Sequence, residues 1–286
     1  MHPIERLRYV ARADGAGVAM LVEAAARALA GMEADQAALV TGCRQMVDRH
    51  PTAGAMWSMT SRLLCSDDPR HEAWLVVEEM EADPTPRVLA GALPDGAVTV
   101  VLGWPELVAQ ALHRRGDLRV RAVDALGEGG QMADALAEAG LDAVCVPEPG
   151  VAAAVADADV VVLEALAMGP TGLVAVAGSR AAAAVARHAG HQVWAVVGEG
   201  RLLPGRLWEA LLGRLDLRGE PWDTDDEVVP IDLVDIVVGP WGVGSAPEAL
   251  GRTSCPVAAE LSKGVFAPGT YRGPDDVTLV RRGPPS

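Results

Sequence analysis

Acidic side chains stand at the ends of three apolar runs in this sequence. They are Asp124, Glu148 and Glu164. A carboxylate at a buried strand end can have a raised pKa, and such a group can act as a general acid or base. We therefore predict Glu164 and Asp124 as candidate catalytic residues. Asp124 and Glu148 are either helix-cap or fold-stabilising carboxylates, or contacts to a ligand.

The tripeptide Gly178-Ser179-Arg180 forms a second candidate site, because it opens an Ala-rich helical pattern after another apolar run. Backbone N–H groups at the start of a helix are free to bind an anion such as phosphate. Arg180 adds a positive charge next to these N–H groups. The alternative is that Gly178-Ser179 only caps the helix, and the sequence leaves both interpretations open.

Elements that position these residues follow from the hydrophobic pattern. Residues 1–92 read as helices and predict a helical N-terminal domain. From residue 93 to about 270, apolar runs alternate with helical patterns, which predicts an α/β domain with a doubly wound, mainly parallel, Rossmann-like sheet. Residues 271–286 read as an irregular tail. Ligands of such sheets bind beyond the carboxyl ends of the strands, where the candidate residues lie.

The central segment resembles a motif of a known family. That family joins the alpha, beta and delta subunits of eukaryotic translation initiation factor 2B with methylthioribose-1-phosphate isomerase and ribose-1,5-bisphosphate isomerase. Its members carry Gly-Ala-Asp at a strand end, an Asn-Gly loop and Asn-Lys-x-Gly-Thr at a helix start. Similar positions here are Leu163-Glu164-Ala165, Thr171-Gly172 and Ala175-Val176-Ala177-Gly178-Ser179.

Three further segments are similar to family motifs, in the same order along the chain. They are Asp48-Arg49-His50-Pro51-Thr52-Ala53, Val123-Asp124-Ala125-Leu126-Gly127 and the stretch from Val228 to Gly242. The resemblance implies that Arg49 and Thr52 contact a small phosphorylated ligand, together with Gly178, Ser179 and Arg180. It also implies a homodimer, with contacts near the apolar stretches Val234–Val238 and Trp241-Gly242-Val243.

The sequence departs from the family at the residues that carry the isomerase chemistry. The family's catalytic Asp falls on Ala165, and its catalytic Cys falls near Gly103 or Trp104, where no Cys occurs. Open-chain aldose–ketose conversion needs an acid and a base across one substrate carbon. Strand alternation turns Glu164 away from the lost Asp, so it is either a reassigned base or a partner of an Arg or backbone group. Trp104 either fills the sugar volume or lines a more apolar pocket.

Three functions are compatible with these departures. The first is a protein without isomerase activity that binds a phosphorylated ligand or serves in assembly. The second is an enzyme on a phosphorylated sugar or nucleotide that uses reassigned acidic residues. The third is a non-catalytic subunit of a translation-factor-like complex. We favour the first of these functions.

Composition excludes several other classes. The net charge of −15, without a run of Lys and Arg, argues against nucleic-acid binding. The four cysteines form no C-x-x-C pair, and no Gly-x-Gly-x-x-Gly follows the first strand, so we expect no metal and no cofactor. Cys145, in an apolar strand, is expected to be buried. No apolar run reaches membrane-spanning length and no signal peptide is evident, so we expect a cytoplasmic protein.

Overall fold

Helices form the N-terminal part of the structure, a computed structural model that describes residues 17–32, 35–215, 220 and 222–262. The helices are α2 (Val18–Ala30), α3 (Gln36–Arg49), α4 (Gly54–Cys65) and α5 (Pro69–Glu81). The Asp35 side chain caps α3 by accepting from two backbone N–H groups, and Asp68 caps α5 just before Pro69. Helix α4 lies at the centre, with Met56, Trp57 and most of its other side chains buried.

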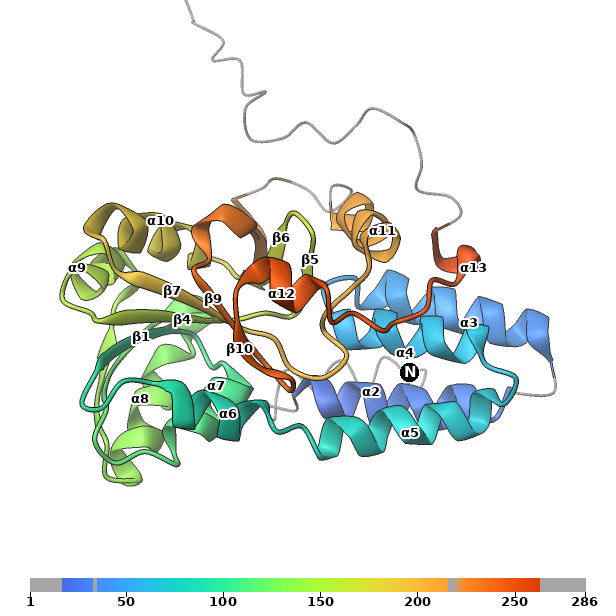
Figure 1. The fold of residues 1–286 in the computed structure, drawn as a ribbon, viewed down its shortest axis with the longest axis horizontal. Coiled ribbons are helices and arrows are strands. Elements are labelled where there is room, and N and C mark those ends of the chain that lie inside the picture. The colour runs from blue at the N-terminus through green and yellow to red at the C-terminus, as the bar shows by residue number, and fades with distance from the viewer. Residues whose placement is uncertain (1–16, 33–34, 216–219, 221, 263–286) are drawn as a thin grey trace, which may run out of the picture.

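A seven-stranded sheet with strand order β10-β9-β7-β4-β1-β2-β3 forms the second part of the fold (Figure 1). Its strands are β1 (Val98–Leu102), β2 (Arg119–Val123), β3 (Asp142–Val146), β4 (Val160–Glu164), β7 (Gln192–Val196), β9 (Ile236–Gly239) and β10 (Gly242–Gly244). All neighbouring strands are parallel except the pair β9–β10. The predicted α/β class, with a helical part followed by a mainly parallel sheet, is therefore confirmed.

Helices cover both faces of this sheet, as in a doubly wound fold. One face packs on α6 (Thr85–Ala92), α7 (Glu106–Leu112) and α8 (Gly129–Glu138). The other packs on α9 (Val151–Ala156), α10 (Ser179–Ala189) and α12 (Ala246–Leu250). The central strands β1 and β4 are buried on both faces, which explains why their sequences are mostly apolar, apart from Thr99 in β1 and Glu164 at the end of β4.

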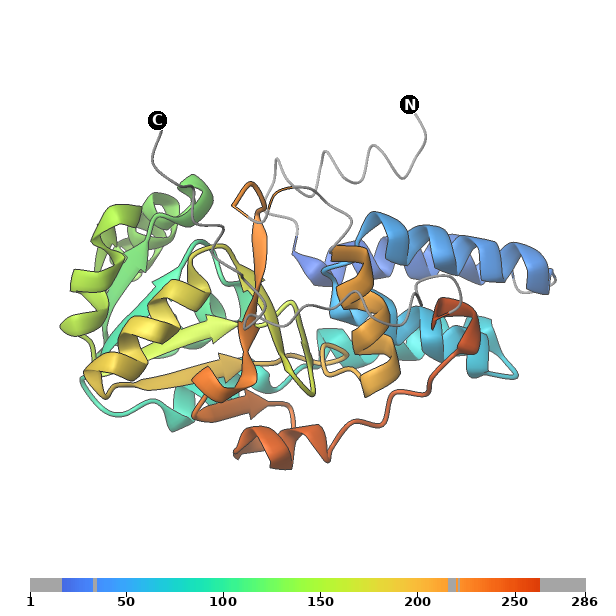
Figure 2. The same ribbon diagram turned by 90° about the horizontal axis from the view of Figure 1, so that it is seen from above.

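The strand order reverses between β1 and β4. From β1 the chain proceeds to β2 and β3 on one side, and it then returns to place β4, β7 and β9 on the other side. The carboxyl ends of these strands point toward the helical part, as the arrows in Figures 1 and 2 show. A backbone hydrogen bond of 2.9 Å from Gly54 N to Leu166 O joins the two parts there. Ligand sites of doubly wound sheets lie at such reversal points.

A small antiparallel sheet follows β4, where the sequence suggests a loop and a short apolar run. It consists of β5 (Ala167–Gly169), β6 (Gly172–Val176) and β8 (Asp226–Pro230) in the order β5-β6-β8. Helix α11 (Gly205–Leu215) and the short α13 (Ala259–Ser262) complete the apolar core of the N-terminal helices. The apolar core of the N-terminal helices therefore also contains residues from far along the chain. The proposed boundary near residue 92 stays a prediction, and the tail 271–286 lies outside the described residues.

The expectation that Cys145 is buried is wrong. Cys145 and Val144 are exposed, because β3 is an edge strand that, among the described strands, pairs with β2 alone. An apolar run identifies a strand but does not say whether the strand is central. None of the helices within the described residues is long and apolar enough to cross a membrane.

Candidate functional site

A cavity of about 290 Å³ lies at the reversal point, beyond the carboxyl ends of β1 and β4. The end of β1 contributes Leu102 and Trp104, and the end of β4 contributes Leu163 and Glu164. Ser179, the first residue of α10, also lines it. The cavity is where the topology of a doubly wound sheet places a ligand, so we take it as the candidate site.

Both carboxylate oxygens of Glu164 are already engaged in hydrogen bonds. Oε2 accepts from Leu107 N at 2.7 Å and Val108 N at 3.1 Å, in the first turn of α7. Oε1 accepts from the Arg201 guanidinium at 2.8 Å. The side chains of Glu164 and Arg201 are only 8% and 4% exposed. This arrangement is that of a buried ion pair that also caps a helix, which matches the interpretation of Glu164 as a partner of an Arg and of backbone groups.

Glu106 is a cavity residue that the sequence analysis did not single out. Burial, and after it the charge of Glu164, raise the pKa of Glu106 above its ordinary value. Its carboxylate accepts a hydrogen bond from Val18 N, at the first turn of α2, and lies against Gly17. The order Pro105-Glu106 is a common helix start, but only the fold shows that another helix begins opposite it.

Ser179 contributes a buried polar atom to the wall of the first cavity. The residue is 1% exposed, and its Oγ has no hydrogen-bond partner among the described residues. Gly178 before it adopts φ +93°, a left-handed conformation that favours glycine. A buried hydroxyl without a partner is costly in free energy, so its presence in a cavity wall indicates a place for a ligand group.

The anion-binding end of α10 is partly occupied by the protein itself. Arg180 N donates a 2.9 Å hydrogen bond to the Glu227 carboxylate, which thereby caps the helix start. The Arg180 side chain is exposed and lines neither this cavity nor the two other cavities found along the same edge of the sheet. A carboxylate therefore stands beside the position that the sequence predicts for a phosphate.

A second, neighbouring cavity of about 260 Å³ holds two other predicted residues. Gly178 and Glu148 line it, together with Val123 and Leu102, and Leu102 also lines the first cavity. The predicted set is thus divided between two adjoining spaces. Trp104, Glu164 and Ser179 share the first, while Gly178 and Glu148 share the second.

The remaining predicted residues lie elsewhere. Asp124 accepts a long hydrogen bond of 3.3 Å from Gly130 N near the start of α8, and it lines neither strand-end cavity. Arg49 is exposed at the end of α3, and Thr52 follows in the next turn. Neither residue lines any of the three cavities along this edge. Their predicted contacts to a ligand stay predictions.

Two apolar side chains border the mouth of the first cavity without filling it. Trp104 is 40% exposed and Leu126 is 52% exposed, and both line the cavity. Leu126 adopts φ +55°, which is uncommon for a residue other than glycine. Such backbone strain tends to occur at functional sites. The space beside Trp104 is therefore open, and part of the indole is exposed there.

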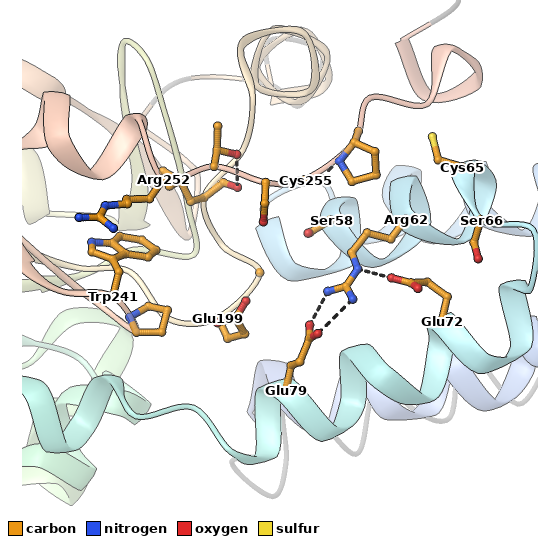
Figure 3. A pocket seen from close by; sticks show the side chains of 16 residues that line it. Ser58, Arg62, Cys65, Ser66, Glu72, Glu79, Glu199, Trp241, Arg252 and Cys255 are labelled. Carbon is orange, nitrogen blue, oxygen red and sulfur yellow. Dashed lines mark hydrogen bonds and ion pairs between the residues drawn. The ribbon is translucent and has the colours of Figure 1, made fainter.

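A third and larger cavity, of about 820 Å³, lies farther along the same edge, beyond β7 and β9 (Figure 3). On its helical side Arg62 forms ion pairs with Glu72 and Glu79. Burial alone would lower the pKa of Arg62, but hydrogen bonds to Glu79 and Glu72 raise it. Glu199 lines the floor, and burial, Asp83 and Glu79 raise its pKa. The indole N–H of Trp241, on the other side, has no partner among the described residues.

The charges of the first cavity decide what chemistry it favours. Four lining residues are acidic, namely Glu106, Glu128, Glu164 and Asp226, and none of its described lining residues is Lys or Arg. Arg201 forms an ion pair with Glu164, and its charge also lowers the pKa of Glu106, though less than burial and Glu164 raise it. Nowhere in the described part of the chain are three or more His, Cys, Asp or Glu placed to hold a metal ion. The wall is thus anionic, with one buried hydroxyl and an apolar, aromatic side.

Comparison with known proteins gives a fold but no sequence relative. No protein-family model matches the chain, and no curated protein matches it. The translation initiation factor eIF-2B from Pyrococcus horikoshii OT3 is similar in structure, with a TM-score of 0.71, 15% identity, and coverage of 86% of this chain and 98% of that chain. One chain of the tetrameric eIF2B-beta2-delta2 complex from C. thermophilum gives a TM-score of 0.64 at 17% identity, with coverage of 87% and 92%. The resemblance expected from the motifs is therefore confirmed at the level of the fold.

Proposed function

We propose that this chain, which has the fold of translation initiation factor eIF-2B, is a non-catalytic protein that binds a small ligand at its strand ends and assembles with a second copy. The proposal rests mainly on the hydrogen bonds of the Glu164 carboxylate. Its two oxygens accept three hydrogen bonds, from Leu107 N, Val108 N and Arg201, so it is fixed as part of the fold. A general base needs a lone pair directed at the substrate proton.

Two further strand-end positions also support a loss of the isomerase acid and base. Ala165, at the position of the family's Asp, is fully buried. Glu106 has the raised pKa of a candidate acid, but its carboxylate accepts from Val18 N and caps α2. These contacts support loss of the isomerase activity that the resemblance would otherwise imply, and they leave binding as the function of the cavity.

Ligand binding is supported by the cavity itself and by the unpartnered hydroxyl of Ser179. The phosphorylated ligand expected from the motifs has weaker support. The start of α10 favours an anion, but Glu227 already accepts from Arg180 N there, and the cavity wall carries carboxylates. The charges of the cavity wall are therefore a better guide to the chemical class of the ligand than the motif.

A thermal-shift screen tests the binding proposal. A ligand present at 100 times its Kd should stabilise the protein by about 2.7 kcal/mol, which raises the Tm of a chain of this length by about 4–5 °C. Replacing Val176, a half-buried residue of the cavity wall, by Trp should abolish that shift by filling the space. Val144→Trp, on the exposed edge strand β3, should keep it. A panel of sugar phosphates, nucleotides, sugars and amines that leaves the Tm of the wild type unchanged would contradict the proposal.

Assembly is supported by the neighbours and by surface features. One structural neighbour belongs to a tetrameric complex by its description. Val237 and Val238, in the stretch expected at the interface, are instead buried in this chain's own sheet. Val243 in β10 is 49% exposed and Val257 is 37% exposed, so apolar surface is available on the adjoining segments.

We expect light scattering to give about twice the chain mass of 29.7 kDa at micromolar concentration. Replacing Val243 by Glu should shift the mass toward the monomer, because a charge in an apolar interface loses its hydration. The control is Val144→Glu, a similarly exposed valine on the opposite edge strand. A wild-type protein that is monomeric under these conditions would refute the homodimer.

A further inference from the structure

We propose that the strand-end cavity, defined by Leu102, Trp104, Glu106, Glu164 and Ser179, binds a small organic cation, a protonated amine on a short hydrocarbon framework. The inference rests on the proposed function, because it names the ligand class of the same cavity. It replaces the phosphorylated ligand that the motifs suggest with a ligand of opposite charge.

Charge is the first argument. Glu106 and Glu128 add negative charge to the wall, while the charge of Glu164 is compensated by its ion pair with Arg201. Like charges repel strongly when water is partly excluded, so a phosphate dianion in this space would be unfavourable. A protonated amine experiences the opposite effect. The acidic wall therefore selects for a cation.

The hydroxyl of Ser179 is an independent observation that points to a ligand. It is 1% exposed, its Oγ has no partner among the described residues, and it lines the same cavity. A hydroxyl oxygen has lone pairs that accept from an ammonium group, and an ammonium group has three donors to offer. An amine in the cavity would thus satisfy a buried polar atom that the described protein groups leave unpaired in this wall.

The start of α10 does not require an added anion. Glu227 accepts the N–H of Arg180 at 2.9 Å and places a carboxylate where a phosphate would otherwise complement the helix dipole. The protein has therefore supplied its own anion at the position that the motif assigns to a ligand. This contact removes the main reason to expect a phosphorylated molecule.

The apolar part of the wall accounts for the hydrocarbon framework. Leu102, Leu163 and Val176 supply aliphatic surface, and the partly exposed indole of Trp104 borders the opening. An aromatic face attracts a cation placed over it. The volume of about 290 Å³ suits a ligand of a few carbon atoms rather than a nucleotide.

Isothermal titration of the full-length protein with 1,4-diaminobutane tests the inference. We expect saturable binding with one site per chain, and no binding of 1,4-butanediol, which has the same framework without charge. Glu128→Gln should lower the affinity for the diamine by about tenfold, because the charge of an exposed carboxylate is lost without disturbing the fold. Ser179→Ala should lower the affinity for the diamine by about 3- to 10-fold. Glu138→Gln, at the other end of α8 and outside the cavity, should change the affinity by less than about twofold.

The outcomes separate this inference from the function on which it rests. If the protein binds ribose 5-phosphate and does not bind the diamine, the inference of a cationic ligand is wrong, whereas the proposed ligand-binding function is retained. If Glu128→Gln and Glu138→Gln lower the affinity for the diamine equally, the affinity depends on the net charge of the protein and not on this cavity. That result would also overturn the inference. Failure of every ligand in the thermal-shift panel removes the binding function itself.

Discussion

Replacing Arg201 by Met should destabilise the protein by about 3–5 kcal/mol, because the change leaves the buried carboxylate of Glu164 without its positive partner. The guanidinium of Arg201 also donates to Ala165 O at 2.9 Å, and that acceptor would lose its hydrogen bond as well. The same change at Arg187, whose side chain is 55% exposed beside Asp235, should cost less than about 0.5 kcal/mol.

Urea unfolding followed by circular dichroism measures this effect, with the double variant Glu164→Gln and Arg201→Met as the decisive control. Glutamine keeps an oxygen for Leu107 N and Val108 N but carries no charge. The double variant should therefore recover part of the stability lost in Arg201→Met. If the double variant is less stable than either single variant, Glu164 does not act as a structural partner of Arg201.

The parallel sheet could be predicted because burial on both faces leaves a clear trace in the sequence. Val160–Leu163 is a continuous apolar run, Val98–Leu102 is apolar except for Thr99, and the structure places strands there, with β4 extended by Glu164. The edge strand β3 shows the same kind of run, so the sequence could not reveal that Cys145 is exposed. The hairpin β5–β6 could not be recognised either, because β5 is three residues long and ends at a Gly beside Pro170-Thr171.

The candidate site was only partly predictable, because its decisive contacts join distant segments. Glu164 is identified by its place at a strand end, but its partner Arg201 lies 37 residues later, in the loop after the neighbouring strand β7. Glu106 lies in the first turn of a helix, where an acidic residue is common and carries no signal by itself. Only the folded chain shows that the start of α2 meets its carboxylate.

The motif at Gly178-Ser179 lies beside the candidate cavity but carries no information about the charge of its wall. The three acidic residues that share the cavity with Glu164 are Glu106, Glu128 and Asp226, and they come from three separate segments. Charge in a cavity is a sum over such segments, and no local pattern contains that sum. The disagreement between motif and cavity is therefore expected where a fold is kept and its site has changed.

The second large effect concerns the reaction that the resemblance would assign to this fold. Ribose 1,5-bisphosphate and methylthioribose 1-phosphate should not be isomerised, because the strand end offers Ala165 and a fully engaged Glu164 in place of an acid and a base. Loss of one positioned acid or base typically lowers a rate by about 10²–10⁴-fold, and the proposed function implies the loss of both. Residual turnover should therefore fall to the uncatalysed rate.

We propose that the strand-end carboxylates stabilise the fold and bind a ligand but transfer no proton. A steady-state assay of ketose formation from both substrates is the most direct test. We expect equal, background rates for the wild type, Glu164→Gln and Glu106→Gln. Sustained ketose production by the wild type that disappears in Glu164→Gln or Glu106→Gln would instead identify that carboxylate as a catalyst and refute the proposed function.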